Sequence, residues 1–156
     1  MTLRDLLERV ERVNEGGRAL DCDIARAFGW HRVEPKFARN KAGGWIAPQD
    51  FLGVYSDGRP VISQHGTDIH RDPPRFSTSV DAALALIGRV LPGHASAVGT
   101  MAFEVARKPW GCIWTPTGAV LKQAEAATPA LALCAALLAA MIGEEAKPSP
   151  PSTVTP

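Results

Sequence analysis

Apolar residues recur at helical spacing in several segments of the chain. Near the start, Leu3, Leu6 and Val10 follow one another at three- and four-residue intervals, which predicts an amphipathic helix. A second, shorter helix is expected over residues 21–28, where Asp21 can serve as the N-cap. The first part of the chain is therefore expected to be helical.

Two longer helices are expected further along the chain. Thr78 is the predicted N-cap of a helix over residues 79–90, which carries one apolar stripe. Thr128 followed by Pro129 is typical of a helix start, and the segment 129–142 behind it is rich in Ala and Leu. Because apolar residues surround the axis of this last helix, we expect it to be buried on most sides or to lie in a subunit interface.

Alternation of apolar and polar residues predicts antiparallel strands between these helices. The Asp57-Gly58 step supplies the positive φ that a tight hairpin turn requires. The expected strands cover residues 51–55 and 60–64, which form this hairpin, and residues 97–106, 110–116 and 118–124, which form a three-stranded meander.

Length and composition favour one domain. With 156 residues, of which 46% are hydrophobic and 21% charged, the chain can bury one core of ordinary size. We expect a single α+β domain over residues 1–143. The Pro/Ser/Thr-rich segment 144–156 has nothing to bury and is expected to be a disordered tail. The uncharged run 129–143 is shorter than the roughly 20 residues that span a bilayer, so no membrane association is expected.

Net charge and cysteine content indicate which partners and which cellular compartment suit the protein. The net charge of +1 gives no global field that would attract nucleic acid or an anionic membrane, so a nucleic-acid partner is not expected. The cysteines Cys22, Cys112 and Cys134 are odd in number and widely spaced, which argues against a disulfide framework or a structural zinc site. The N-terminus is charged and amphipathic and lacks the continuous apolar segment of a signal peptide. These features favour a cytoplasmic protein.

Three blocks of sequence carry a resemblance to a known family. They are Leu20-Asp21-Cys22-Asp23-Ile24-Ala25, the block 75–84 and the block 127–134. In order and spacing, over about residues 1–143, the chain resembles the small phage and prophage proteins grouped as the phage ABA sandwich domain. It departs from the family pattern at Cys22, Asp23 and Phe76 and in a long basic loop.

This resemblance implies an α/β/α sandwich, in which helices pack on both faces of an antiparallel sheet. It also implies a viral or prophage origin and therefore the cytosol of a bacterial host. The family supplies no established catalytic residues, so the resemblance supports a fold more than a function.

Residues 30–50 show no clear periodicity, which predicts a long loop with one short strand near Trp45. Cations and aromatic residues alternate here, with Glu34 as the one acid between residues 30 and 45. Cationic side chains can pair with phosphate while aromatic faces stack on bases. The candidate ligand-binding residues are Trp30, Arg32, Lys36, Arg39, Lys41 and Trp45 in this loop, with Arg71, Arg75 and Arg107 outside it. The alternative is a solvated loop whose tryptophans anchor it to the core.

The remaining residues that could bind a metal or take part in catalysis fit structural roles better. His65, Asp68, His70 and Asp72 lie close together in sequence, but their spacing matches no known zinc motif. The carboxylate pairs Asp21/Asp23 and Glu144/Glu145 fit a helix start and a helix end. The three cysteines occupy positions that apolar periodicity would bury. We therefore expect no catalytic residue, no metal and no cofactor, and a binding protein rather than an enzyme.

Three functions remain open from the sequence. The first is a phage-encoded accessory protein that binds a small phosphorylated ligand without turnover, such as a nucleotide signal of host defence. The second is a structural or protein-interaction module, with the Ala-rich helix 129–142 as a homo-oligomer or host-protein interface. The third is a metal-dependent hydrolase built around His65, Asp68 and His70. A homo-oligomer is expected.

Overall fold

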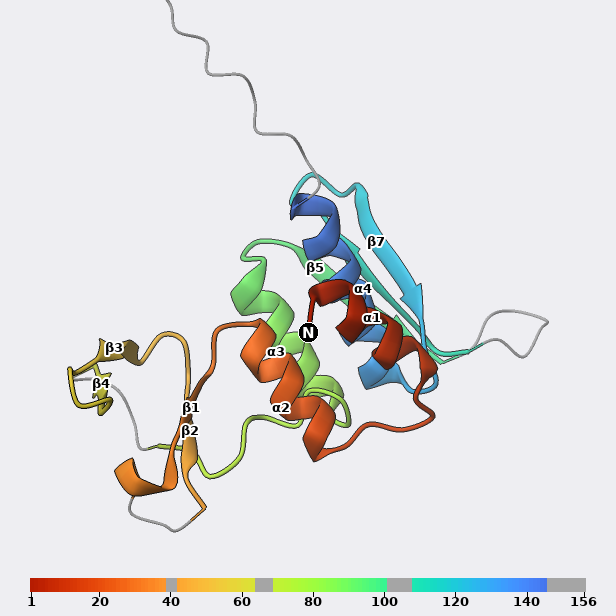
Figure 1. The fold of residues 1–156 in the computed structure, drawn as a ribbon. Coiled ribbons are helices and arrows are strands. Elements are labelled where there is room, and N and C mark those ends of the chain that lie inside the picture. Colours follow the sequence, from red (N-terminus) through yellow and green to blue (C-terminus); the bar gives the residue numbers. More distant parts are fainter. Residues whose placement is uncertain (39–41, 64–68, 101–107, 146–156) are drawn as a thin grey trace, which may run out of the picture.

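The computed structural model describes residues 1–38, 42–63, 69–100 and 108–145. Figure 1 shows their arrangement. The helices are α1 (Leu3–Arg12), α2 (Arg18–Ala27), α3 (Val80–Val90) and α4 (Pro129–Glu145), with a short 3-10 helix at Pro35–Phe37. The strands are β1 (His31–Val33), β2 (Gly44–Ile46), β3 (Phe51–Val54), β4 (Pro60–Ile62), β5 (Ala95–Gly99), β6 (Trp110–Trp114) and β7 (Val120–Glu125).

The predicted helices are confirmed, and local sequence explains where two of them begin. Thr2 and Asp5 form a capping box at the start of α1, in which each side chain accepts the other residue's backbone N–H. At the start of α4, the Thr128 hydroxyl accepts the N–H of Leu131 at 3.2 Å, and Pro129 occupies the first helical position. These caps satisfy backbone donors that a helix start leaves free.

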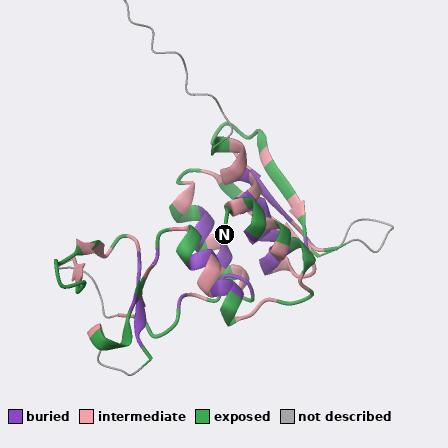
Figure 2. Cartoon of the chain, viewed as in Figure 1, coloured by how far each residue is buried: buried purple, intermediate pink, exposed green. Residues whose placement is uncertain are grey.

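The helix α4 occupies the middle of the molecule. Every residue from Ala130 to Leu138 is buried, so all sides of its first turns are covered (Figure 2). The helices α1 and α3 pack against it, and it also packs on β5, β6 and β7. A Cβ atom at Gly111 of β6 would lie 2.8 Å from the backbone of Ala132, which shows how closely the sheet approaches α4. Of the two alternatives for this helix, burial within its own chain is the one observed.

The strands form three small antiparallel sheets: β1–β2, β3–β4 and β5–β6–β7. In the largest, Ala97 lies opposite Cys112, which in turn lies opposite Gln123. The meander is thus confirmed at β5, β6 and β7, while residues 101–106 of its first predicted strand lie outside the described residues. The chain is a single α+β domain, as the sequence predicts.

The described helices and the largest sheet pack together around α4. The three-stranded sheet meets the described helices chiefly through α4, and α4 itself lies between this sheet and the other helices. The physical reason is that α4 is apolar on every side and can be covered from two directions. We call α1–α4 together with β5–β7 the helical body.

The described residues between 31 and 62, with strands β1–β4, form a smaller unit that stands out from the helical body (Figure 1); we call it the β lobe. Over residues 30–50 the sequence predicts a long loop with one short strand near Trp45; β2 is that strand, but the chain also pairs it with β1. The cause is Trp45, whose buried ring lies under the guanidinium groups of Arg26 and Arg32, 5.2 and 5.6 Å from the ring centre. The hairpin of β3 and β4 is confirmed.

The C-terminal boundary is slightly later than predicted. The helix α4 continues through Glu144 and Glu145, which the sequence assigned to the tail, and the rest of the predicted tail lies outside the described residues. None of the described helices combines the length and the apolar character that crossing a bilayer requires.

Candidate functional site

A buried hydrogen-bonded pair joins the start of α2 to the segment before α3. The Asp21 carboxylate accepts the backbone N–H of Ser77 at 2.8 Å and its hydroxyl at 2.6 Å. Ser77 is fully buried and Asp21 is 4% exposed. The Ser77 Oγ also accepts the N–H of Gly17 at 3.0 Å. We call this pair the Asp21–Ser77 clamp.

Near the clamp, the structure shows that two predicted helix starts were wrong. Asp21 is not the N-cap of α2, because the helix already begins at Arg18 with Gly17 as its N-cap. Thr78 is not the N-cap of α3, because Ser79 accepts the N–H of Ala82 and the helix begins one residue later. Asp21 is engaged instead by long-range hydrogen bonds to Ser77, whereas at α3 the neighbouring Ser79 supplies the local cap.

All three blocks of the family resemblance meet at the clamp. Asp21 comes from the first block, Ser77 from the second and Cys134 from the third, and the Cys134 thiol donates to the Phe76 carbonyl at 3.2 Å. Burial, and to a lesser extent the nearby Asp21 charge, raises the pKa of Cys134 to about 12. A neutral, buried thiol is not a nucleophile. The clamp therefore holds the fold together and positions its neighbours.

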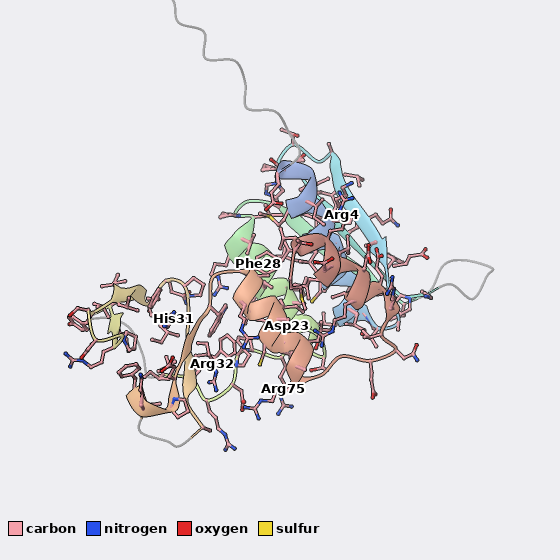
Figure 3. The ribbon with its side chains drawn as sticks, viewed as in Figure 1. Arg4, Asp23, Phe28, His31, Arg32 and Arg75 are labelled. Atoms are coloured by element: carbon pink, nitrogen blue, oxygen red, sulfur yellow. The ribbon has the colours of Figure 1, made fainter. Side chains whose placement is uncertain are left out.

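A cavity of about 290 Å³ opens next to the clamp. Its lining combines cations, acids and small polar groups from the start of α2 and the segment 72–78. The lining residues are Gly17, Arg18, Asp21, Asp72, Pro73, Arg75 and Thr78. Figure 3 places Arg75 beside the first turn of α2. We call this space the α2 cavity.

The charged side chains that line the α2 cavity differ in whether they have a partner among the described residues. Arg18 pairs with Asp72 at 2.5 Å, and the Asp21 carboxylate is held by Ser77. Arg75 is exposed and forms no ion pair with any described residue. Its guanidinium is therefore the cation in this cavity that is free to take a ligand.

Backbone donors add to this cation. The first intrahelical bond of α2 runs from the N–H of Asp21 to the Gly17 carbonyl at 2.9 Å. The N–H groups of Arg18, Ala19 and Leu20 precede it, and no side chain caps them. Such a helix start favours negative charge. Of these three residues Arg18 lines the α2 cavity, so an anion entering it would lie close to this helix start and to Arg75.

The basic aromatic loop is used mainly to build the β lobe. Trp30 and Trp45 are buried, which favours the anchoring alternative for the two rings. Arg32 donates to the carbonyls of Ala42 and Gly44 at 2.8 and 3.0 Å. These bonds and its contact with Trp45 engage its guanidinium inside the hairpin.

Lys36 is a described cation of this loop that lies at the surface. It pairs with Glu34 at 3.3 Å, and both side chains are about two-thirds exposed. Lys36 and Arg32 border a second cavity of about 170 Å³, between the 3-10 helix and the turn after β3. This volume is smaller than the 290 Å³ of the α2 cavity, which also places a cation beside a helix start. The α2 cavity is the better candidate site.

The other candidate cations are placed as follows. Arg71 is exposed and does not line the α2 cavity. Figure 3 shows Arg32 near the β lobe and Arg75 near α2, so the structure does not gather the predicted cations at one point. Arg39, Lys41 and Arg107 lie outside the described residues.

The described residues that were candidates for metal binding or acid–base catalysis do not come together at one site either. Within the described residues, no group of three His, Cys, Asp or Glu side chains could hold a metal ion; His65 and Asp68 lie outside them. Asp23 pairs with Arg9 and Arg26, away from the carboxylate of Asp21. Cys112 and Cys134 are buried as predicted, but Cys22 is only half-buried.

Comparison with known proteins found no matching family model, no matching curated protein and no matching solved structure. The resemblance to phage proteins therefore stays a prediction.

Sequence reasoning missed Arg18 and Thr78 as cavity residues. One signal was present in the Gly16-Gly17 pair. A Cβ atom at Gly16 would collide with the Ser77 carbonyl, so a glycine is needed where the two segments meet. A pair of glycines before a charged helix start can thus mark a close backbone contact as well as a helix end.

Proposed function

We propose that this protein binds a small phosphorylated ligand, without turnover, in the α2 cavity. The observation that carries the proposal is the position of Arg75, an exposed guanidinium without a described acid partner, beside the uncapped start of α2. Guanidinium groups and free helix amides both recognise phosphate oxygens.

The mixed lining favours a nucleotide over a bare phosphate. A nucleotide carries a phosphate, which accepts hydrogen bonds, and also hydroxyl or amino groups, which donate them. Asp21 and Asp72 line the same cavity and can accept from such donors. The cavity volume of about 290 Å³ is close to the lower limit of about 300 Å³ for ligand pockets, which favours a small ligand. Nothing in the lining is arranged as a nucleophile with its base, which supports binding without reaction.

The biological role follows from the resemblance. Small phage proteins include inhibitors that sequester nucleotide signals of host defence, and we propose this role for the chain in the cytosol of a bacterial host. The single cavity cation that is free for a ligand, Arg75, is consistent with modest affinity for one phosphate group.

The first test is a thermal-shift screen of the full chain. The probes are inorganic phosphate, adenosine monophosphate, cyclic dinucleotides, cyclic ADP-ribose variants and divalent metal ions. A ligand that binds the folded state raises the melting midpoint by mass action. We expect a nucleotide to raise it and divalent metals to leave it unchanged. No shift with any phosphorylated probe would contradict the proposal.

Two variants then locate the site. Arg75→Ala removes the free cation, and loss of a charge-assisted contact of about 1.5–3 kcal/mol should weaken binding roughly 10- to 100-fold. Arg71→Ala is the matched control, because Arg71 carries the same charge four residues earlier and does not line the cavity. Equal losses in both variants would mean that overall charge attracts the ligand and the α2 cavity does not select it.

Asp72→Asn tests whether negative charge in the α2 cavity weakens the binding of a phosphorylated probe. This substitution frees Arg18 from its ion pair and lowers the negative charge of the cavity, so affinity for a phosphorylated probe should rise. Lys36→Ala should leave affinity unchanged if the loop site is not used. A fall in affinity with Lys36→Ala and no change with Arg75→Ala would move the site to the basic loop.

A further inference from the structure

Exposed apolar side chains concentrate on β3 of the β lobe and on the residue that follows it. Leu52, Val54 and Tyr55 are 67%, 56% and 52% exposed. Among the described residues, the other large apolar side chains exposed to this degree are Met1 and Val120. Figure 1 shows β3 at the far end of the β lobe from the helical body. Such a concentration on a monomer marks an interaction surface.

The backbone of β3 has a free edge at the same place. The Tyr55 N–H donates to the Arg59 carbonyl at 2.8 Å, and Val54 lies opposite Pro60. Since bonded and non-bonded pairs alternate in an antiparallel ladder, the N–H and C=O of Val54 point away from β4. In the described part of the chain β3 pairs with β4 alone, so these two groups face an open edge.

The opposite edge of this sheet is protected, which makes the two edges unequal. Pro60 lies in the same non-bonded pair as Val54, so its position on the outer edge of β4 carries no N–H donor. Proline on an edge strand blocks pairing with another strand. The β3 edge carries no such block at Val54 and has apolar side chains beside it.

Charge indicates what kind of partner fits this edge. The ionic side chains of the adjoining turn, Asp57 and Arg59, pair with each other at 2.8 Å, so the turn adds no net charge. A nucleic acid or an anionic membrane would need uncompensated cations. A second copy of the same edge is neutral and apolar, and it presents matching donors and acceptors under two-fold symmetry.

We propose that β3 is a self-association edge, through which two copies of this chain pair as antiparallel strands around Val54. The two hairpins then form one four-stranded sheet, which is more stable than an isolated two-stranded hairpin. The α4 helix is unavailable for this role because its own chain covers it. This pairing is independent of the α2 cavity, which lies in the helical body.

The pairing region is short. The β3–β4 ladder shifts register between Phe51 and Gly53, so its regular part is the end that contains Val54. Stable interfaces bury about 800 Å² per partner, and one short strand provides less. The dimer is therefore weak and depends on concentration.

The test is sedimentation velocity of the full chain over a concentration series. For the wild type, the fraction of dimer should rise with concentration. Val54→Lys places a charge on the free edge, and Leu52→Lys places one on the neighbouring apolar surface; both variants should stay monomeric at every concentration. Unchanged circular dichroism and melting midpoints show that the variants fold.

Val120→Lys is the matched control, because Val120 is 60% exposed on β7 of the helical body and should leave the dimer unchanged. A wild type that is monomeric throughout the series would overturn the proposal. So would dimerisation that Val120→Lys abolishes and Val54→Lys preserves.

Discussion

The helical body and the β lobe are built in different ways. In the helical body, α4 is buried among α1, α3 and the β5–β7 sheet. In the β lobe the strands are three or four residues long, and their position depends on a few ring contacts. His31 stacks on Phe51 with 4.1 Å between ring centres. Many small apolar contacts define the body, whereas a few aromatic and cationic contacts define the lobe.

This difference also separates the two proposed surfaces. The α2 cavity lies in the helical body beside the buried Asp21–Ser77 clamp, so its geometry is fixed by the core. The β3 edge lies in the lobe, where exposed apolar residues and a free backbone edge are available. A rigid frame suits ligand recognition, and an open edge suits strand pairing.

The largest effect is expected from Leu133→Asp in α4. Leu133 is fully buried, and an unpaired carboxylate there should cost at least about 4 kcal/mol, a large part of the roughly 5–15 kcal/mol that stabilises a domain. Far-ultraviolet circular dichroism should show an unfolded chain at 37 °C or a melting midpoint far below the wild type. Leu52→Asp in the exposed face of β3 is the control and should melt like the wild type. Mild effects in both would mean that α4 is not the centre of the core.

Trp45→Ala should separate the lobe from the body. The substitution removes a buried ring together with its contacts to Arg26 and Arg32, a loss of about 3–5 kcal/mol. Hydrogen exchange should speed up across residues 31–62 while amides of α1 and α4 keep their protection. Trp45→Phe should show a smaller change. If exchange speeds up equally in α4, the lobe and the body unfold as one unit.

The clamp is tested by two carboxylates on the same helix. Asp21→Ala leaves the buried N–H of Ser77 without its acceptor, which should lower the free energy of unfolding by about 2–4 kcal/mol. Asp23→Ala removes the ion pairs with Arg9 and Arg26 near the surface, which should cost about 1 kcal/mol or less. Urea unfolding measures both. A larger loss for Asp23→Ala would show that the clamp does not stabilise the fold.

A smaller effect is expected at alkaline pH. The pKa of Cys134 is raised from 9.0 to about 12 in the folded protein, so between these values the unfolded chain loses the thiol proton and the folded chain keeps it. The contribution of this group to stability is thus present below about pH 9 and is lost as the pH rises towards 12. Cys134→Ala should flatten the fall in unfolding free energy over this range. Cys22→Ala, at a half-buried position, should not flatten it.

The sequence predicts much of the helical body because its signals are local. The Thr2–Asp5 capping box, the Thr128-Pro129 start and the apolar surround of α4 each depend on residues that are close together in the chain. Periodicity and cap chemistry therefore suffice to place these helices. Periodicity shows that a helix such as α4 is buried, but it does not show which elements cover it.

The clamp and the cavity could not be predicted in this way. Asp21 and Ser77 are far apart in sequence, and each has a plausible local role as a helix-start residue. The short strand near Trp45 was predicted, but β1 and its pairing with β2 were missed. The cause is that Trp45 is covered by Arg26 of α2, a contact between segments with no shared pattern. Long-range polar contacts leave no periodic signal, so a single sequence does not reveal them.

The most direct test of the ligand cavity is amide chemical-shift mapping by nuclear magnetic resonance. The probe is the nucleotide that gives the largest thermal shift, titrated into the full chain and into Arg75→Ala. We expect saturating shifts at the amides of Arg18, Ala19 and Thr78 in the wild type, and their loss in the variant. Saturating shifts centred on Lys36 and Phe37, or shifts at Arg18 that persist in Arg75→Ala, would contradict this expectation.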